Sequence, residues 1–185
     1  MERPCFDLIN SDWHDWRRPG VRADRLDNPG WVSRFLTDWG LDVDEPLAGE
    51  ARARLGVLRS LLRRLVDDFR AGRPLDAADV AQLDTVLAAA PLRRRTEPKG
   101  GRCEGRFEPV TRDWAWVAAE TAASFVKLVE TGEPGRLKVC ENVDCLWVFY
   151  DDSRNRTRRW CDSRGCGNLI KVRRFRAKRR AEKTP

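Results

Sequence analysis

The sequence predicts a mostly helical α+β protein: a helical N-terminal domain that carries one β-hairpin, followed by a small treble-clef-like module made of a knuckle, a β-hairpin and a C-terminal helix. Three observations favour this fold class. Apolar residues recur every three or four positions through much of the N-terminal domain, which is the period of amphipathic helices. Gly100-Gly101 between two short runs in residues 92–110 indicates a hairpin. Two tight cysteine pairs near the C-terminus indicate a small stapled module.

The helices of the N-terminal domain have recognisable start and stop signals. A short amphipathic helix follows Pro29 and ends at Gly40, and a longer one spans residues 45–72 with apolar residues along one face. Asp76 can cap a third helix, which Pro91 ends. We therefore expect three consecutive helices before the chain changes character.

A further helix and a linker follow the expected hairpin. Thr111 or Asp113 can cap this helix, which is rich in tryptophan and alanine. The best linker in the chain, Glu133-Pro134-Gly135, comes directly after it. We therefore expect a boundary here, between a helical domain of residues 1–132 and a module of residues 133–185.

The four cysteines of the module have the spacing of a structural zinc site. They read C-x4-C, fifteen residues and C-x4-C again, and they are Cys140, Cys145, Cys161 and Cys166. Two tight pairs let four thiolates converge on one ion, and a closed tetrahedral shell leaves no position for a substrate. A module of this size needs such a staple because its own core is small. We therefore expect one structural Zn²⁺ per chain.

Two disulfides, or four unrelated thiols, are the alternative interpretation of these cysteines. Disulfides need an oxidising compartment. The N-terminus does not look like a secretory signal, because Asp7 interrupts its short apolar stretch. The zinc interpretation is therefore favoured. Cys5 and Cys103 have no partner at a useful spacing, and we expect each to be a buried small hydrophobic residue.

Positive charge is concentrated in the same module. The formal net charge is +7, and residues 136–185 hold fifteen Lys and Arg against six Asp and Glu. The rest of the chain is slightly acidic. No stretch approaches about eighteen consecutive apolar residues, so we expect no membrane-spanning helix. We find no phosphate loop, dinucleotide fingerprint or common hydrolase motif, so we do not expect an enzyme. A basic zinc module indicates nucleic acid as the partner.

The module's sequence also predicts how it would contact duplex DNA. Residues 146–150 are expected to form a strand that pairs with residues 156–160, and Cys166 opens the C-terminal helix. A basic helix fits the major groove, and a basic hairpin can hold the flanking phosphates. The expected DNA contacts are Arg154, Arg156, Arg158 and Arg159 on the hairpin, and Lys171, Arg173, Arg174 and Arg176 on the helix. Because one finger offers little reading surface, we also expect a homodimer on two half-sites.

Tryptophan is abundant in this chain, with eight in 185 residues. The simpler explanation is aromatic packing in the core. The alternative is a pocket for a small-molecule effector, bordered by Asn10, Trp13, Trp31 and Trp114. His14, the only histidine, has no partner at a catalytic spacing and is a poor candidate for chemistry.

The run from Val139 to Asn168 closely resembles the CGNR-type zinc finger, which is found at the C-terminus of bacterial proteins described as stress-induced transcription regulators. The N-terminal part resembles the helical ABATE domain that accompanies this finger. The matching residues are Leu8-Ile9-Asn10-Ser11, Pro29-Gly30-Trp31 and Asp113-Trp114-Ala115-Trp116. One position departs from the pattern: the arginine that ends the family's Cys-Gly-Asn-Arg signature is Leu169 here, which removes one cation.

The resemblance implies a sensor domain joined to a DNA-binding finger. We therefore expect a zinc-dependent DNA-binding transcription regulator with an N-terminal ligand-sensing domain, located in the bacterial cytoplasm and associated with the nucleoid when bound to DNA. An RNA-binding or protein-interaction module stabilised by structural zinc is the alternative, because similar zinc modules also bind those partners.

Overall fold

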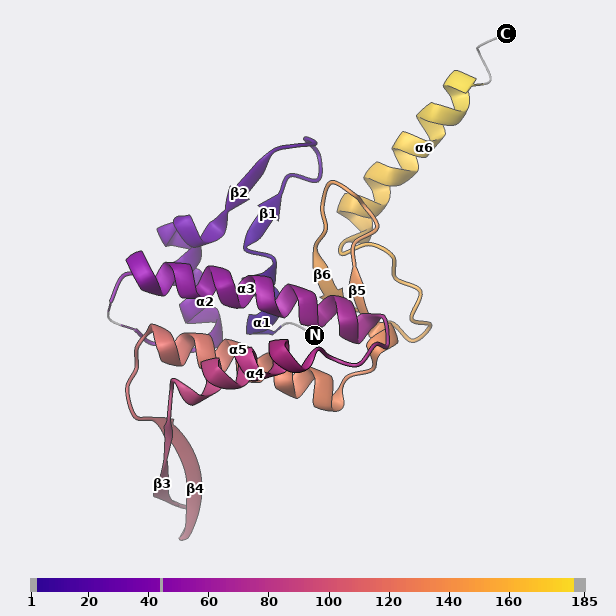
Figure 1. Ribbon diagram of the computed structural model, residues 1–185. Coiled ribbons are helices and arrows are strands. Elements are labelled where there is room, and N and C mark those ends of the chain that lie inside the picture. The colour runs from indigo at the N-terminus through magenta and orange to yellow at the C-terminus, as the bar shows by residue number, and fades with distance from the viewer. Residues whose placement is uncertain (1–2, 44, 182–185) are drawn as a thin grey trace.

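The computed structural model describes residues 3–43 and 45–181, and its N-terminal part is built mainly from helices (Figure 1). These are α1 (Pro4–Ile9), α2 (Pro29–Trp39), α3 (Gly49–Arg70), α4 (Ala77–Ala88) and α5 (Trp114–Thr131). Two antiparallel ribbons extend from them, formed by β1 (Asp12–His14) with β2 (Arg22–Asp24) and by β3 (Leu92–Lys99) with β4 (Arg102–Pro109). The expected mostly helical α+β fold is confirmed.

Helix α3 supplies much of the hydrophobic core and packs against α1, α4 and α5. Its leucines at the expected spacing, including Leu58, Leu62 and Leu65, are almost completely buried. Phe125 of α5 is also fully buried. The helix begins later than expected, at Gly49, because the preceding residues fold back over α5, where the carbonyl of Glu45 accepts a hydrogen bond from Trp114.

Side-chain caps begin α4 and α5, and a left-handed glycine ends α2, where the sequence indicated these boundaries. Asp76 accepts hydrogen bonds from two backbone N–H groups of α4. Asp113, rather than Thr111, caps α5 by accepting from the backbone N–H of Trp116. Gly40 ends α2 with φ 63°, a conformation that glycine adopts without a steric penalty.

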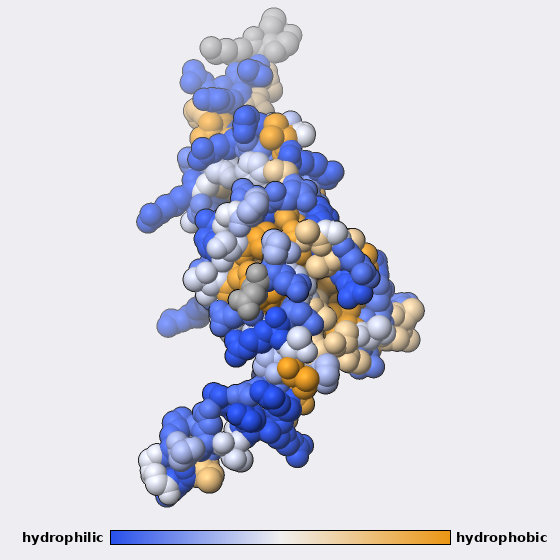
Figure 2. All heavy atoms as spheres, turned by 90° about the vertical axis from the view of Figure 1, so that its left-hand side faces the viewer, coloured by the Kyte–Doolittle hydropathy of each residue, from blue (hydrophilic) through white to orange (hydrophobic). Residues whose placement is uncertain are grey.

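The β3–β4 hairpin projects away from the helices (Figure 1). Gly100 and Gly101 both have positive φ, as a two-residue hairpin turn requires. Figure 2 shows this projection as mostly hydrophilic, below a hollowed face where apolar side chains are exposed. The expectation that Cys103 is buried is wrong: a projecting two-stranded ribbon has nothing to cover it, and Cys103 is exposed. Cys5, by contrast, is fully buried, and its burial raises its thiol pKa to about 11.

The C-terminal module contains one ribbon and one long helix. Its elements are η2 (Pro134–Arg136), β5 (Leu137–Val139), β6 (Val148–Tyr150), the π-helical turn η3 (Ser163–Gly167) and α6 (Asn168–Ala181). Strands β5 and β6 pair antiparallel, with Leu137 opposite Tyr150. The knuckle with the first two cysteines therefore forms the loop of this hairpin, and η3 carries the last cysteine into α6.

The second strand expected over residues 156–160 is wrong, since β6 pairs with β5 and that segment is an extended loop. Its backbone is bound mainly by side chains, with one backbone hydrogen bond from the N–H of Glu141 to the carbonyl of Arg159. Lys138 donates to the carbonyls of Arg156 and Arg158, and Asp151 accepts from the backbone N–H of Arg158. Because the loop's polar backbone groups are satisfied in this way, they are not free to form a ladder.

The module shares its hydrophobic core with the helices. Leu137 of β5 and Val148 of β6 are almost fully buried in the same cluster as the apolar residues of α1, α3 and α5. Residues 134–136, at the expected linker, form a short 3-10 turn. The module is therefore packed against the helical part and does not hang from a flexible tether.

Candidate metal centre and nucleic-acid interface

The four predicted cysteine ligands converge on one point. The sulfur atoms of Cys140, Cys145, Cys161 and Cys166 all lie within 4.8 Å of one another. The Cys145–Cys161 and Cys161–Cys166 sulfurs are 3.7 and 3.8 Å apart. Zinc–sulfur bonds of about 2.3 Å place tetrahedral sulfurs about 3.8 Å apart. A disulfide would need about 2.05 Å, so the geometry fits a four-thiolate zinc site and not a pair of disulfides.

These thiols also influence one another's ionisation. Hydrogen bonding with Cys140 raises the pKa values of Cys145 and Cys161, whereas hydrogen bonding with those two thiols lowers the pKa of Cys140. Four adjacent thiolates would repel one another, and a positive ion between them would offset this repulsion. With all four positions taken by sulfur, such an ion would have a structural role.

Asn142 and Asp162 hold the two cysteine-bearing loops in place. Asn142 is fully buried, and its amide nitrogen lies 3.5 Å from the sulfur of Cys166 and 3.4 Å from the carbonyl oxygen of Trp16. Asp162 accepts hydrogen bonds from two backbone N–H groups of η3, which orients the turn that carries Cys166. The knuckle, the helix and the N-terminal domain thus meet around the metal site.

Asp151 organises the basic loop that follows β6. This residue is fully buried and accepts hydrogen bonds from Lys138, from the hydroxyl and backbone N–H of Ser153, and from the backbone N–H of Arg158. Burial opposes its ionisation, but these donors outweigh the burial and hold the pKa of Asp151 well below its usual range. An ionised Asp151 therefore fixes the loop that displays Arg154 and Arg156.

Half of the eight expected DNA contacts already have partners within the module. Arg156 pairs with Glu133 at 2.6 Å, and Arg173 pairs with Asp144 at 2.7 Å. Arg159 forms a two-pronged pair with Glu141, while Arg158 stacks 4.7 Å from the centroid of the Phe149 ring. These four arginines hold the module together as well as adding charge.

The other four expected contacts are exposed: Arg154, Lys171, Arg174 and Arg176. Among the described residues they form no hydrogen bond or ion pair. Three of them lie on α6, which projects from the module into solvent (Figure 1). No residue of α6 is buried, so no apolar stripe holds this helix against the rest of the module. Leu169, at the position of the family's arginine, is half-buried at the start of the helix.

The structure does not bring the four expected pocket residues together around one hollow. Asn10 lines a hollow beside the knuckle, whereas Trp114 lines two others next to α3. Trp31 stacks on Phe35 at 5.3 Å within the core. Trp13 is separated from its neighbours by strand alternation, because Asp12 and His14 point to one face of β1 and Trp13 to the other.

Asn10 joins the N-terminal domain to β6 of the module. Its amide nitrogen donates to the carbonyl of Val148 at 2.9 Å, and its amide oxygen accepts from the N–H of the same residue at 2.8 Å. Arg25 adds a second link, since its guanidinium lies 5.6 Å from the Trp13 ring and 5.3 Å from the Trp147 ring. This junction is formed by residues that no sequence motif marks as contacts.

We expect the Asn10→Ala variant to lose about 2–4 kcal/mol of unfolding free energy, because it leaves a buried N–H and a buried C=O of Val148 unpaired. Urea denaturation measures the change. Asn155→Ala, at an exposed turn position, is the control and should change stability by less than about 0.5 kcal/mol. Equal stability of Asn10→Ala and wild type would show that water forms hydrogen bonds with the N–H and C=O groups of Val148 in place of the amide.

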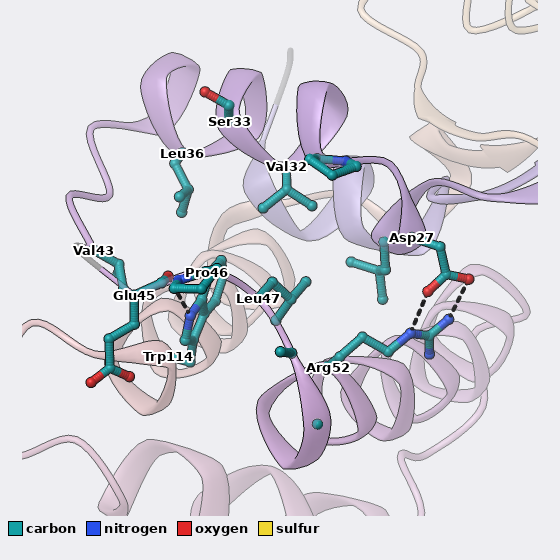
Figure 3. A pocket seen from close by; sticks show the side chains of 14 residues that line it. Asp27, Val32, Ser33, Leu36, Val43, Glu45, Pro46, Leu47, Arg52 and Trp114 are labelled. Carbon is teal, nitrogen blue, oxygen red and sulfur yellow. Dashed lines mark hydrogen bonds and ion pairs between the residues drawn. The ribbon is translucent and has the colours of Figure 1, made fainter.

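Two hollows lie beside Trp114 in the N-terminal domain. One, of about 690 Å³, lies between α2 and the start of α3. In Figure 3, Val32, Leu36 and Leu47 point toward it, with Trp114 on one side and the Arg52–Asp27 pair on the opposite side. The other, of about 650 Å³, lies between α3, α4 and α5 and is mostly apolar. Both have the size of small-molecule sites.

Comparison with protein families agrees with both halves of the structure. Residues 136–179 match the CGNR zinc finger family. Residues 2–132 match the ABATE family, whose description is "Putative stress-induced transcription regulator", a regulator rather than an enzyme. No curated protein matches the chain.

Within the described residues, no helix has the length and apolarity needed to cross a membrane. The match to the finger and the converging sulfurs together give one structural zinc, held by the four cysteines. The chain therefore belongs to the ABATE family, and it carries a CGNR zinc finger after the ABATE domain.

Proposed function

We propose that this ABATE protein is a zinc-dependent, DNA-binding transcription regulator, and that α6 and the loop of residues 152–159 contact duplex DNA. The observation that carries the proposal is the character of α6. Over fourteen residues this helix has seven Lys and Arg, no carboxylate and no buried residue, and it projects from the zinc site. A free-standing basic helix has the width that a major groove accepts.

The two basic elements would have different roles on the duplex. Lys171, Arg174 and Arg176 are exposed on the helix, where they can reach base edges or phosphates. Arg154 lies on the loop that Asp151 holds, where it can contact a flanking phosphate. The paired arginines, Arg156, Arg158, Arg159 and Arg173, contribute to the local potential and fix the shape of the surface.

The alternative function is binding of RNA or of a protein by the same module. Phe175 on α6 is 61% exposed, and an exposed aromatic ring can stack on an unpaired base or enter a protein pocket. The charge of the helix favours a nucleic acid over a neutral protein surface. Competition between duplex DNA and single-stranded RNA separates the first two partners.

The N-terminal domain would act as the ligand-sensing part of the regulator. Support comes from hollows of suitable size and from the contact between the domain and the finger through Asn10 and Arg25. We further propose a homodimer, because one finger contacts few base pairs, and two half-sites would supply the missing affinity. Such a regulator would work in the bacterial cytoplasm, at the nucleoid when bound to DNA.

Selection of binding sequences from genomic DNA tests this function directly. The zinc-loaded full-length protein should enrich a small set of duplex sites, and a dimer would enrich sites with two related halves. The matched control is the variant Lys171→Gln with Arg174→Gln and Arg176→Gln, which should enrich none of them. Enrichment of no duplex site, or stronger binding to single-stranded RNA than to duplex DNA in a parallel competition, would contradict the proposal.

A further inference from the structure

We infer that the hollow between the N-terminal domain and the zinc knuckle binds a small phosphate-bearing anion. This inference rests on the ligand-sensing part of the proposed function, and it assigns that part a site and a ligand class. The hollow has a volume of about 370 Å³. Residues of the β1–β2 ribbon and of α3 line one side of it, and residues 145–147 of the knuckle line the other.

The charged side chains around this hollow are mostly cationic. Among the described residues that line it, Asp12 is the acidic member. The basic members are Arg22, Arg59, Arg63 and Arg64, and His14 also lines the hollow, with its Nε2 atom 3.5 Å from the Asp12 carboxylate. They converge for a structural reason: Arg22 and His14 are register partners on one face of the ribbon, and that face is turned toward the arginines of α3. An arrangement of this kind attracts a small anion.

Two of these arginines are held rigidly by carboxylates that lie outside the lining. Arg59 binds both oxygens of Asp24 at 2.7 Å, and Arg64 binds both oxygens of Asp79 at 3.0 and 2.6 Å. Each two-pronged pair uses two of the five N–H donors of a guanidinium, and Arg59 gives a third to the hydroxyl of Ser11 at 2.9 Å. The pairs therefore fix the positions of the arginines while leaving them donors for a ligand, which lowers the entropic cost of binding.

The other two arginines have little charge compensation. Arg22 contacts the Nδ1 atom of His14 at 3.4 Å, and among the described residues it has no carboxylate within ion-pair distance. Arg63 donates to the carbonyl of Leu146 at 3.0 Å and reaches the nearer oxygen of Asp67 only at 3.4 Å. A phosphate would supply Arg22 with an anionic partner and Arg63 with a closer one than Asp67, in the geometry that guanidinium groups prefer.

The size of the hollow limits which phosphate-bearing molecules can bind in it. Small-molecule sites are about 300–1,000 Å³, and this one is near the lower limit. It can hold inorganic phosphate or the phosphate ester of a small metabolite. A DNA duplex cannot enter, although a backbone phosphate could touch the rim.

The position of the hollow links its occupancy to the zinc site. Leu146, whose carbonyl accepts from Arg63, directly follows the zinc ligand Cys145. Arg22 belongs to the N-terminal domain. Arg63 belongs to the same domain, so a phosphate held by both arginines would fix the Arg63 guanidinium that donates to Leu146, strengthen this contact between the domain and the knuckle, and slow the release of zinc.

The test uses the zinc-loaded full-length protein and inorganic phosphate as the probe, titrated at constant ionic strength by calorimetry. We expect saturable binding of about one phosphate per chain, weakened at least tenfold in Arg22→Gln with Arg63→Gln. Arg22→Gln alone keeps the contact between Arg63 and Leu146, so it should fold normally and still bind phosphate less tightly. The matched control, Arg54→Gln with Arg93→Gln, removes two exposed arginines outside the hollow and should bind like wild type.

The second measurement is the rate at which zinc passes to a coloured chelator. Phosphate should slow this transfer in wild type and in the control, but not in the Arg22 and Arg63 variant. Phosphate binding that is not saturable, or that the control loses equally, would overturn the inference. The inference would also be overturned if wild type binds no phosphate and the Arg22 and Arg63 variant loses affinity for DNA. The hollow would then be a DNA contact. Failure of wild type to bind any DNA would count against the proposed function alone.

Discussion

Replacing Cys161 with serine should release the zinc, unfold residues 136–181 and abolish DNA binding. Structural zinc contributes about 10–16 kcal/mol in small finger peptides, and apart from Leu137 and Val148, which pack into the helical core, this part of the chain has only a small core of its own. Burial beside the metal site is limited to a small cluster that includes Phe149 and the cysteines. Elemental analysis, circular dichroism and a DNA-binding assay measure the three losses.

The helices of the ABATE domain should survive this change, but with lower stability. Leu137 and Val148 belong to the helical core, and each contributes about 1.5–3 kcal/mol when fully buried. Loss of the module's order should therefore lower the melting temperature of the helices by roughly 10 °C. Cys103→Ser, at an exposed position on the hairpin, is the control and should behave like wild type. Full zinc content in Cys161→Ser would contradict the assigned ligand set.

Replacing Asp151 with asparagine should disorder the basic loop while leaving the zinc in place. Both carboxylate oxygens of Asp151 accept hydrogen bonds. At one of these two positions, the NH₂ group of asparagine would point at a hydrogen-bond donor and repel it. Lys138 would also lose its buried counter-charge. We expect a loss of about 3 kcal/mol in stability and at least a tenfold loss in DNA affinity.

Hydrogen exchange of residues 152–159 should be faster in this variant, and its zinc content should equal that of wild type. Asp84→Asn, on the exposed face of α4, removes the same charge and is the matched control. Unchanged exchange and unchanged DNA affinity in Asp151→Asn would show that the loop is held by other contacts.

Local patterns in the sequence predicted the helices and the metal site well. Helix α3 follows from leucines spaced by three and four, and the zinc site follows from two C-x4-C pairs, because both depend on short-range spacing. The turn at Gly100-Gly101 is equally local. In each case the residues that decide the structure are neighbours in the chain.

Long-range pairing could not be predicted in the same way. The partner of β6 is β5, which lies before the knuckle, and the competing segment is held by Lys138 and Asp151 from both sides of the cysteine pair. Residues 10–16 looked like one cluster of polar and aromatic groups, but β1 sends Trp13 to the opposite face from His14. Arg52 and Arg59 of α3 are bound to Asp24, which closes the β1–β2 ribbon onto the helix, and no local spacing in the sequence indicates this contact.

The salt dependence of DNA affinity tests the central claim most directly, because it counts the phosphate contacts made by α6 and its loop. For a selected duplex, log K of wild type should fall against log salt with a slope of roughly −5, as expected for about five to seven neutralised phosphates. Lys171→Gln with Arg174→Gln and Arg176→Gln should reduce the slope to roughly −2 or −3 and weaken binding. The matched control, Arg54→Gln with Arg93→Gln and Arg95→Gln, removes three exposed arginines elsewhere and should keep the wild-type slope. An unchanged slope and affinity in the α6 variant, or an equal loss in the control, would contradict the assignment of this helix as the DNA-binding element.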